Sequence, residues 1–236
     1  MKKSTGDPIG RAIIDYSKTK KPSDIIVHSE LCEDDIIPVE ILFRSYNEMP
    51  AIEKKALSMC HGEVLDVGAG AGMHASWIKK KGLEVDVMEI SPGAILYLKE
   101  QNINVISTSF YEAPSEKKYD TLLMMMNGIG IAGKLSNLHE FLLKVKKLLK
   151  PGGQFLFDSA DIRHLYEEED GSLWVDLNSE YYGNFKFQME YKKELGDWFD
   201  WLYVDYDTVH DYARKIGAKS EKIMENENHF LARIIF

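Results

Sequence analysis

The sequence predicts an α/β fold built on an open, mostly parallel sheet, and three observations support this prediction. From residue 63 onward, short apolar strands alternate with helical segments in a regular order. The strand at 120–126 is apolar at almost every position, which is typical of a central parallel strand buried on both faces. Two further strand segments, at 219–224 and 229–236, close the chain. Because parallel strands are joined by crossover helices, this order favours helices on both faces of one sheet.

Composition and charge narrow the class of protein. The 236 residues are 44% hydrophobic and 28% charged, close to the average of soluble globular proteins. The formal net charge of −9 disfavours nucleic acid as a partner. No apolar run has the length of a signal peptide or approaches the roughly 18 residues that a membrane span requires, and the two cysteines lack metal-ligand spacing. We therefore expect a cytoplasmic protein without a membrane partner.

Five strands and the helices between them make up the predicted sheet. Ser91 followed by Pro92 is typical of the start of a helix, which we expect to run to about residue 101. The longest helix is expected over 134–149, where leucine and valine recur at helical spacing. The strands are expected at 63–67, 84–90, 103–107, 120–126 and 154–159.

The chain before this sheet is predicted to be mostly helical up to residue 61. Asp7 is placed to cap a helix over residues 7–20, and Pro8 suits the first turn of that helix. The apolar segments that follow it show no clear strand alternation. We therefore expect a helical N-terminal segment in front of the sheet.

Residues 160–206 interrupt the alternation of strands and helices. Residues 181–191 alternate between two sets of side chains, one largely aromatic and one polar, which predicts a strand. Gly196-Asp197 is expected to form the turn of a hairpin with the segment that follows. Asp207 is then expected to cap a short helix that ends at Gly217.

The strongest functional signal is the glycine-rich turn VLDVGAGAG at residues 64–72. A strand runs through Asp66 directly into Gly68, Gly70 and Gly72, and a helix follows. Glycines at such a turn let the backbone bend tightly and let a ligand approach without a β-carbon in the way. An ordinary strand–helix turn also contains glycine, but three glycines at alternate positions favour a nucleotide-binding turn.

The spacing of the glycines and a nearby acid bear on which ligand binds. A dinucleotide-binding turn would carry its third glycine at position 73, but that residue is Met73, and the third glycine is Gly72. Glu89 ends the second strand, where a carboxylate can accept hydrogen bonds from both hydroxyls of a ribose. The alternative for Glu89 is a solvated acid at a strand end.

Together with two later segments, these motifs resemble the class I S-adenosylmethionine-dependent methyltransferases. The later segments are KYDTLLMMMN at 118–127 and LLKPGGQFLF at 148–157, and all the motifs stand in the order and at the spacing of that family. The resemblance covers about residues 60–160 and the terminal strand pair. It implies a Rossmann-like sheet of seven strands, mostly parallel, with helices on both faces and the last strand antiparallel.

The resemblance also implies which residues bind the cofactor, S-adenosylmethionine. The glycine turn would hold the methionine part, with Asp66 supporting the loop, while Glu89 would bind the ribose. Ile90 would pack against the adenine, and Ser109 stands where the family often has an acid. The implied cofactor-binding residues are Asp66, Gly68, Ala69, Gly70, Gly72, Glu89, Ile90, Ser109, Phe110, Met126 and Asn127.

The resemblance is less specific about the residues that would contact the methyl acceptor. Met126 and Asn127 follow the fourth strand and would face the substrate. Methyl transfer requires that the nucleophile lie in line with the S–CH3 bond and that water be excluded, and a base is needed only when the nucleophile arrives protonated. Asp161, His164 and Tyr166 follow the fifth strand and are candidates for such a base or for substrate contacts, although such residues also occur at helix starts and surfaces.

The resemblance therefore implies an enzyme that transfers a methyl group to a small-molecule acceptor by in-line displacement. An NAD(P)-dependent oxidoreductase and a non-catalytic S-adenosylmethionine-binding or interaction protein are the alternatives. Arg44 and Arg163 could anchor a carboxylate or phosphate, but both are expected at the surface. No metal site is predicted, because the histidines lack ligand spacing. A homodimer is left open.

We predict a single methyltransferase domain over residues 1–236. An aromatic-rich β-hairpin cap, inserted before the sixth strand, is expected to cover the substrate crevice beyond the carboxyl ends of the strands. The predicted parts are an N-terminal helical lid at 1–60, a cofactor-binding core at 61–160, the substrate cap at 161–206, and a closing helix and strand pair at 207–236.

Overall fold

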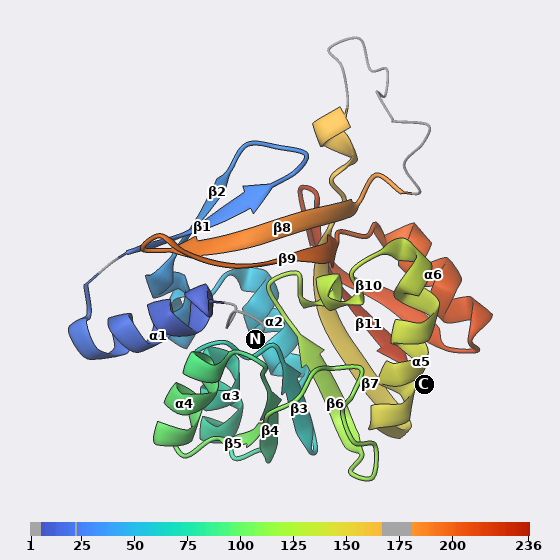
Figure 1. Ribbon diagram of the computed structural model, residues 1–236. Helices are drawn as coiled ribbons and strands as arrows, with labels where there is room; N and C mark the ends of the chain where they lie inside the picture. The colour runs from blue at the N-terminus through green and yellow to red at the C-terminus, as the bar shows by residue number, and fades with distance from the viewer. Residues whose placement is uncertain (1–5, 22, 167–180) are drawn as a thin grey trace. The chain divides into compact units, whose positions relative to one another are not determined.

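The computed structural model describes residues 6–21, 23–166 and 181–236 (Figure 1). The chain divides into two compact units: Met1–Pro114 with Lys186–Phe199, and Ser115–Phe185 with Asp200–Phe236. Its strands form a four-stranded sheet in the order β2-β1-β8-β9 and a seven-stranded sheet in the order β10-β11-β7-β6-β3-β4-β5. The predicted α/β fold with a seven-stranded sheet is therefore confirmed.

Three parallel strands and two helices form the core of the first unit. They are β3 (Val64–Val67), α3 (Met73–Lys80), β4 (Val85–Met88), α4 (Pro92–Glu100) and β5 (Asn104–Ile106). β3 pairs in parallel with β4, and β4 pairs in parallel with β5. Ala75, Val87 and Leu98 are fully buried in one cluster of this core. Ser91 caps α4 as predicted, because its side chain accepts a hydrogen bond from the Ala94 N–H.

The first unit also contains the N-terminal elements. They are α1 (Pro8–Thr19), β1 (Asp24–Ser29), β2 (Asp35–Pro38), η1 (Val39–Phe43), η2 (Tyr46–Glu48) and α2 (Ala51–Met59). Asp7 caps α1 as predicted. The prediction of a mostly helical segment is wrong for β1 and β2, which pair with each other in antiparallel register. β1 also pairs with β8 (Asn184–Tyr191), so the strand depends on a partner far along the chain that the local pattern does not show.

The predicted hairpin is present, but its turn lies elsewhere. β8 is followed by β9 (Glu194–Leu202), and the two strands are neighbours in the four-stranded sheet. The turn is formed by Lys192 and Lys193, which have φ angles of 49° and 68°, and not by the predicted Gly196-Asp197. A type I′ hairpin turn, which matches the strand twist, needs positive φ at both central positions, and here two lysines adopt it in place of glycine.

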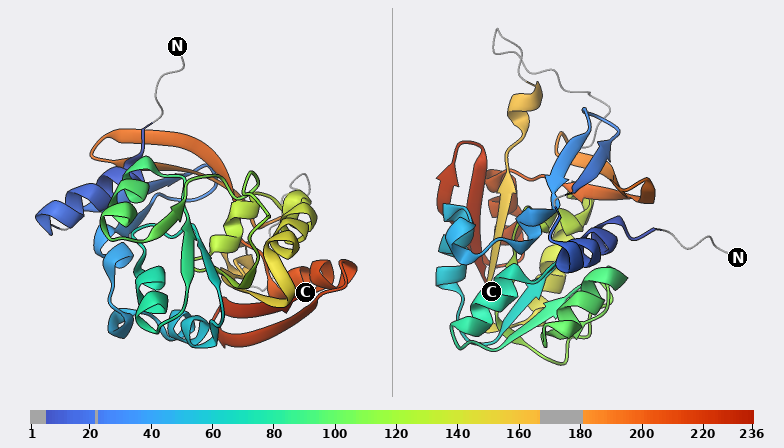
Figure 2. Two further views of the ribbon diagram at one scale, coloured as in Figure 1. Left: turned by 90° about the horizontal axis from the view of Figure 1, so that it is seen from below. Right: turned by 90° about the vertical axis from the view of Figure 1, so that its left-hand side faces the viewer.

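The second unit contains the remaining strands and helices. They are β6 (Tyr119–Met124), η3 (Gly128–Ala132), η4 (Leu135–Asn137), α5 (Leu138–Leu148), β7 (Leu149–Ala160), η5 (Arg163–Tyr166), α6 (Tyr206–Lys215), β10 (Lys219–Asn226) and β11 (His229–Ile235). β6 and β7 are parallel, whereas β11 is antiparallel to both β7 and β10, as the resemblance implied. α5 and α6 lie against each other (Figure 2). The cap of α6 is Asp205 and not the predicted Asp207, which lies in the first turn.

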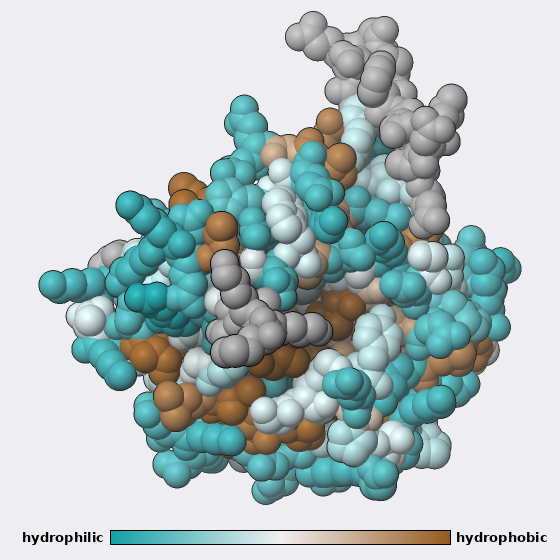
Figure 3. Space-filling view, viewed as in Figure 1, coloured by the Kyte–Doolittle hydropathy of each residue, from teal (hydrophilic) through white to brown (hydrophobic). Residues whose placement is uncertain are grey.

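The face of the molecule in Figure 3 is largely hydrophilic, and the described helices are short. On the face shown in Figure 3, most surface residues are hydrophilic, in agreement with a mean hydropathy of −0.29. Within the described ranges, none of the helices combines the length and the apolar character that crossing a bilayer demands.

Candidate cofactor site

The glycine turn between β3 and α3 has a backbone that only glycine adopts easily. The φ angles of Gly68, Gly70 and Gly72 are 72°, 55° and 75°, all in the left-handed region. The Gly68 N–H donates to the Met88 carbonyl at 2.9 Å, and the Gly72 N–H donates to the Ala69 carbonyl at 2.8 Å. The turn is thus tied to the end of β4 and closed on itself before α3 begins.

Gly70 and Gly72 are needed for different reasons. A β-carbon at Gly72 would lie 2.5 Å from Leu98 Cδ2, so this glycine is required by the packing of α3 against α4. A β-carbon at Gly70 would meet no described atom within 4 Å. The Gly70 backbone therefore borders open space, as expected of a peptide that a ligand approaches closely.

Glu89 is held by three backbone N–H groups at the end of β4. Its Oε2 accepts from the Gly70 N–H at 2.9 Å, and its Oε1 accepts from Ile90 at 2.7 Å and Ser91 at 2.9 Å. Burial raises the pKa of this carboxyl, and the three N–H donors oppose the rise. Because only 8% of Glu89 is exposed, the alternative of a solvated acid at a strand end is wrong.

Asp66, in the middle of β3, is a second buried acid beside the turn. Burial raises its pKa to about 6, while the electrostatic interaction with His74 and the hydrogen bond from the Ala75 N–H act in the opposite direction. Its Oδ2 atom is buried and has no hydrogen-bond partner among the described residues. A polar atom buried in this way is available to an additional donor near the turn.

Next to Asp66 lies a chain of ionisable groups that sequence reasoning missed. Glu53 of α2 is 4% exposed. Its Oε1 accepts from Arg44 Nη2 at 2.7 Å, and its Oε2 lies 3.0 Å from His74 Nε2 at the start of α3. Arg44 is therefore a largely buried ion-pair partner and not the surface residue that was expected, with 19% of its side chain exposed. No local motif links these residues, because they come from three separate elements.

The residues implied for adenine recognition differ in exposure. Ile90 is 69% exposed, whereas Phe110 is 4% exposed. Ser109 Oγ donates to Glu112 Oε2 at 2.9 Å. Sequence reasoning missed Glu112, an exposed acid close to the position where the family often has one; its spacing of three residues from Ser109 was the available signal.

In the second unit, the residues implied to face the substrate have a strained backbone. Met126 and Asn127 follow β6 with φ angles of 61° and 57°, a conformation that costs about 1 kcal/mol or more for residues other than glycine. The Asn127 N–H donates to Asp158 Oδ1 at 2.9 Å, and its side-chain amide donates to the Leu202 carbonyl at 3.3 Å. Asp158 is 1% exposed and also contacts His229 Nε2 at 2.7 Å. The strain is thus held in place by a buried carboxylate.

The three candidate bases after β7 are not all brought together. Asp161 Oδ1 accepts from the Tyr182 hydroxyl at 3.0 Å, and the Tyr166 hydroxyl donates to the Tyr182 carbonyl at 2.9 Å. The exposed ring of His164 lies 3.0 Å from the Asn228 amide and contacts only the backbone carbonyl of Asp161. Asp161 and Tyr166 therefore share one cluster around Tyr182, to which the His164 ring does not belong.

Two tyrosines and a capping aspartate complete this cluster, and sequence reasoning missed all three. Asp205 Oδ2 accepts from Tyr181 at 2.6 Å and from Tyr182 at 3.2 Å. Burial raises the pKa of Tyr182 to about 12 and also raises that of Tyr181. Burial acts to raise the pKa of Asp205 as well, but hydrogen bonds from Tyr181 and Thr208 lower it overall. At neutral pH the cluster therefore holds hydroxyl donors around an ionised carboxylate.

Metal-ligating side chains do not gather in the part of the chain that the structure describes. Over residues 6–21, 23–166 and 181–236, no group of three or more His, Cys, Asp or Glu is placed to hold a metal ion.

Comparison with known proteins decides the family. A family profile described as "Methyltransferase domain" matches residues 21–203, well over half of the chain. The chain belongs to this methyltransferase family. The match includes the glycine turn, Glu89 and the β6–β7 segment, which are the parts of the sequence that carried the resemblance.

Individual relatives agree with this assignment. A crystal structure of a SAM-dependent methyltransferase from Bacteroides fragilis in complex with S-adenosyl-L-homocysteine has 40% sequence identity to this chain and a TM-score of 0.90, covering 98% of this chain and 97% of that one. The CcbJ methyltransferase of Streptomyces caelestis has 14% identity and a TM-score of 0.60 over 80% of this chain and 93% of that one, which shows the shared fold.

A curated relative matches over a shorter length. The ubiquinone biosynthesis O-methyltransferase of Rickettsia conorii is 26% identical over 61% of this chain. The match spans about half of that relative, 53% of its length.

Proposed function

We propose that the protein is an S-adenosylmethionine-dependent methyltransferase that transfers a methyl group to a small-molecule acceptor. The observation that carries this proposal is the Gly70–Glu89 pair, in which a buried carboxylate lies beside an open glycine peptide at the end of β4. The family match and the similarity to the Bacteroides fragilis methyltransferase over nearly the whole chain support it. An oxidoreductase would need a dinucleotide turn, which the glycine spacing does not match.

The residues of the first unit fit the cofactor chemically. Glu89 keeps acceptor capacity beyond its three N–H donors, since a carboxylate offers about four lone-pair sites for ribose hydroxyls. The open space at Gly70 admits a ligand against the backbone, and the exposed Ile90 offers an apolar surface to a planar base. Asp66 is buried in β3, the strand that leads into the glycine turn, and we assign it a role in supporting that turn. When bound, the cofactor supplies an electrophilic methyl group on a sulfonium.

The second unit supplies the acceptor side of the proposal. Met126 and Asn127 have a strained backbone held by Asp158, and the proposal assigns them to the border of the cofactor and the substrate. Among the candidate bases, Asp161 is favoured because its carboxylate is joined to the Tyr182 hydroxyl, whereas the His164 ring is exposed and apart. An oxygen nucleophile is the first acceptor class to test, since the curated relatives include O-methyltransferases.

The predicted division into lid, core, cap and closing pair remains part of the proposal. Residues 6–59 of the expected lid contain two strands as well as helices. The expected cap at 161–206 includes the hairpin strands β8 and β9, and its residues 167–180 lie outside the described residues.

Calorimetric titration tests the proposal directly. We expect the purified protein to bind S-adenosylhomocysteine saturably and not to bind NADH. Glu89→Gln keeps the size of the side chain but replaces one acceptor oxygen by a donor, and we expect it to weaken S-adenosylhomocysteine binding at least tenfold, on the order of the loss of a hydrogen bond to a charged group. Glu100→Gln, an exposed change on α4, is the matched control. NADH binding alone, or equal affinity in wild type and Glu89→Gln, would refute the proposed site.

A further inference from the structure

A single carboxylate joins the starts of two helices in the first unit. Asp7 caps α1 through the Gly10 N–H at 3.1 Å. The same carboxylate accepts from the Gly93 N–H at 2.8 Å and from Ser91 Oγ at 2.8 Å, both at the start of α4. The sequence predicted two separate caps, whereas the structure joins them at one side chain.

Ser91 continues this connection to Glu89. Its backbone N–H donates to Glu89 Oε1 at 2.9 Å, its hydroxyl donates to Asp7, and the same oxygen accepts from the Ala94 N–H at 3.1 Å. Ser91 is 7% exposed, so water competes little with these bonds. An unbroken series of hydrogen bonds therefore runs from Asp7 through Ser91 and Glu89 to the Gly70 peptide of the cofactor turn.

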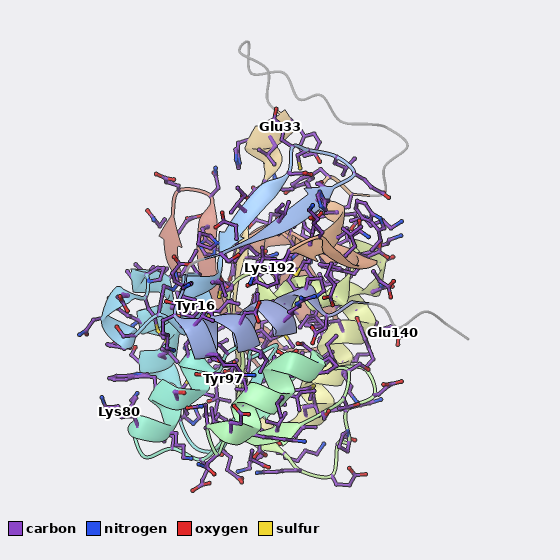
Figure 4. All side chains as sticks on the ribbon, turned by 60° about the vertical axis from the view of Figure 1, so that its left-hand side comes forward. Tyr16, Glu33, Lys80, Tyr97, Glu140 and Lys192 are labelled. Carbon is purple, nitrogen blue, oxygen red and sulfur yellow. The ribbon has the colours of Figure 1, made fainter. Side chains whose placement is uncertain are left out.

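The helix that carries Asp7 is held firmly against α4. A β-carbon at Gly93 would lie 2.5 Å from the Gly10 carbonyl group, so the two backbones touch. Tyr16 of α1 and Tyr97 of α4 are labelled in Figure 4. Both pack on Phe43, with ring centroids 4.8 and 5.4 Å away. Because the two helices approach so closely, the Asp7 carboxylate has little freedom to move away from Ser91.

We propose that Asp7 and Ser91 are positioning residues for cofactor binding, which fix the Glu89 carboxylate in the orientation that receives the ribose. This inference rests on the proposed function. Neither residue is proposed to contact the cofactor. Asp7 holds the Ser91 hydroxyl, and the Ser91 backbone N–H holds Glu89. α1 lies outside the predicted core of the family, but through its Asp7 cap it is coupled to the cofactor site. Burial and, to a smaller extent, the negative charge of Asp7 raise the pKa of Glu89, so the two carboxylates also interact through space.

The test measures S-adenosylhomocysteine affinity by calorimetry in Asp7→Asn and Ser91→Ala. We expect each to weaken binding about five- to thirtyfold, the range of one or two lost hydrogen bonds near a charged group. Asp15→Asn is the matched control, because it makes the same substitution on α1, where Asp15 contacts Tyr191 and Lys192 and not Ser91. We expect its affinity to stay within about twofold of wild type.

A double-mutant cycle separates positioning from a loss of stability. If Asp7 acts through Glu89, the effect of Asp7→Asn disappears in the Glu89→Gln background; an equal effect in both backgrounds would show a merely structural role and overturn the inference. Wild-type affinity in Ser91→Ala would overturn it as well, and this variant carries the same cycle if Asp7→Asn does not fold. Unchanged affinity in Glu89→Gln would instead refute the proposed site, so the two failures are distinguishable.

Discussion

Two glycines of the cofactor turn, Gly70 and Gly72, are expected to differ in what their substitution costs. Gly72→Ala places a β-carbon against Leu98 at positive φ, so we expect a loss of about 2–4 kcal/mol in the free energy of unfolding. The β-carbon of Gly70→Val meets open space, so we expect the cost to come from backbone strain at positive φ, about 1–2 kcal/mol with the fold intact. Its effect falls on the ligand, and S-adenosylhomocysteine binding should be abolished. Urea unfolding and calorimetry measure both quantities.

Two outcomes for Gly70→Val would contradict this prediction. If Gly70→Val were the less stable variant, the open space at Gly70 would have to be filled in the folded protein. If it bound S-adenosylhomocysteine as well as wild type, the cofactor would not approach the Gly70 peptide.

The buried carboxyl of Asp66 predicts a pH dependence of stability. Burial raises its pKa from 3.8 to about 6, so the folded state binds the proton more tightly than the unfolded state. The resulting stabilisation is complete below about pH 4 and is lost as the pH rises through about 6, by roughly 2–3 kcal/mol. Asp66→Asn cannot titrate and should lack this loss.

Urea unfolding between pH 4 and 7 measures this difference. We expect the stability of Asp66→Asn relative to wild type to rise across that interval. A constant difference between the two proteins would mean that Asp66 is already ionised in the fold at pH 4, against the direction of the shift.

At the scale of elements, the Arg44–Glu53–His74 chain ties the N-terminal segment to the start of α3. Glu53→Gln leaves the largely buried Arg44 and the buried His74 without their carboxylate, and we expect a loss of about 2–3 kcal/mol in the free energy of unfolding. Glu100→Gln on α4 is exposed and should change stability by less than about 0.5 kcal/mol. Urea unfolding measures the stability of both variants. Equal stabilities of Glu53→Gln and Glu100→Gln would contradict a structural role for the Arg44–Glu53–His74 contacts.

The elements that sequence reasoning found and missed differ in the range of the interactions that form them. Ser91 with Pro92 and Asp7 with Pro8 were predicted as caps, because a cap is recognised within a few neighbouring residues. β1 and β2 were missed, since β1 completes its pairing with β8 more than 150 residues away in the chain. The hairpin turn was misplaced because Lys192 and Lys193 adopt positive φ, which the preference for glycine does not predict.

In the candidate site, too, the residues that could be predicted have a local sequence signature, and the residues that were missed depend on distant parts of the chain. Gly70 and Glu89 could be predicted because the turn and the strand end each have a local signature and a family resemblance. Glu53, His74 and the Asp7–Ser91 bond could not, because each depends on how separate helices pack. Tyr182 was predicted as part of an alternating strand, yet it precedes β8 and joins Asp161 and Asp205 instead.

At the scale of the whole molecule, the proposed cofactor residues are distributed over both compact units. Gly70 and Glu89 belong to the first, and Met126 and Asn127 belong to the second. If the residues of the first set bind the cofactor, S-adenosylhomocysteine should slow amide hydrogen exchange at residues 68–72 and 89–91, and exchange at 126–128 tests separately whether Met126 and Asn127 bind it as well. The edge strand β10 is far along the chain from all of them and serves as the internal reference.

Hydrogen exchange followed by mass spectrometry, with and without saturating S-adenosylhomocysteine, measures this prediction. Protection at residues 68–72, 89–91 and 126–128, absent in Glu89→Gln at the same ligand concentration, is the expected outcome, because amides that exchange through local openings are slowed where the ligand contacts or orders the backbone. Protection confined to residues 68–72 and 89–91 would remove Met126 and Asn127 from the cofactor site. The strained backbone after β6 would then have to serve the acceptor alone, and the search for substrate contacts would move to the Asp158–Asn127 bond and the Tyr182 cluster.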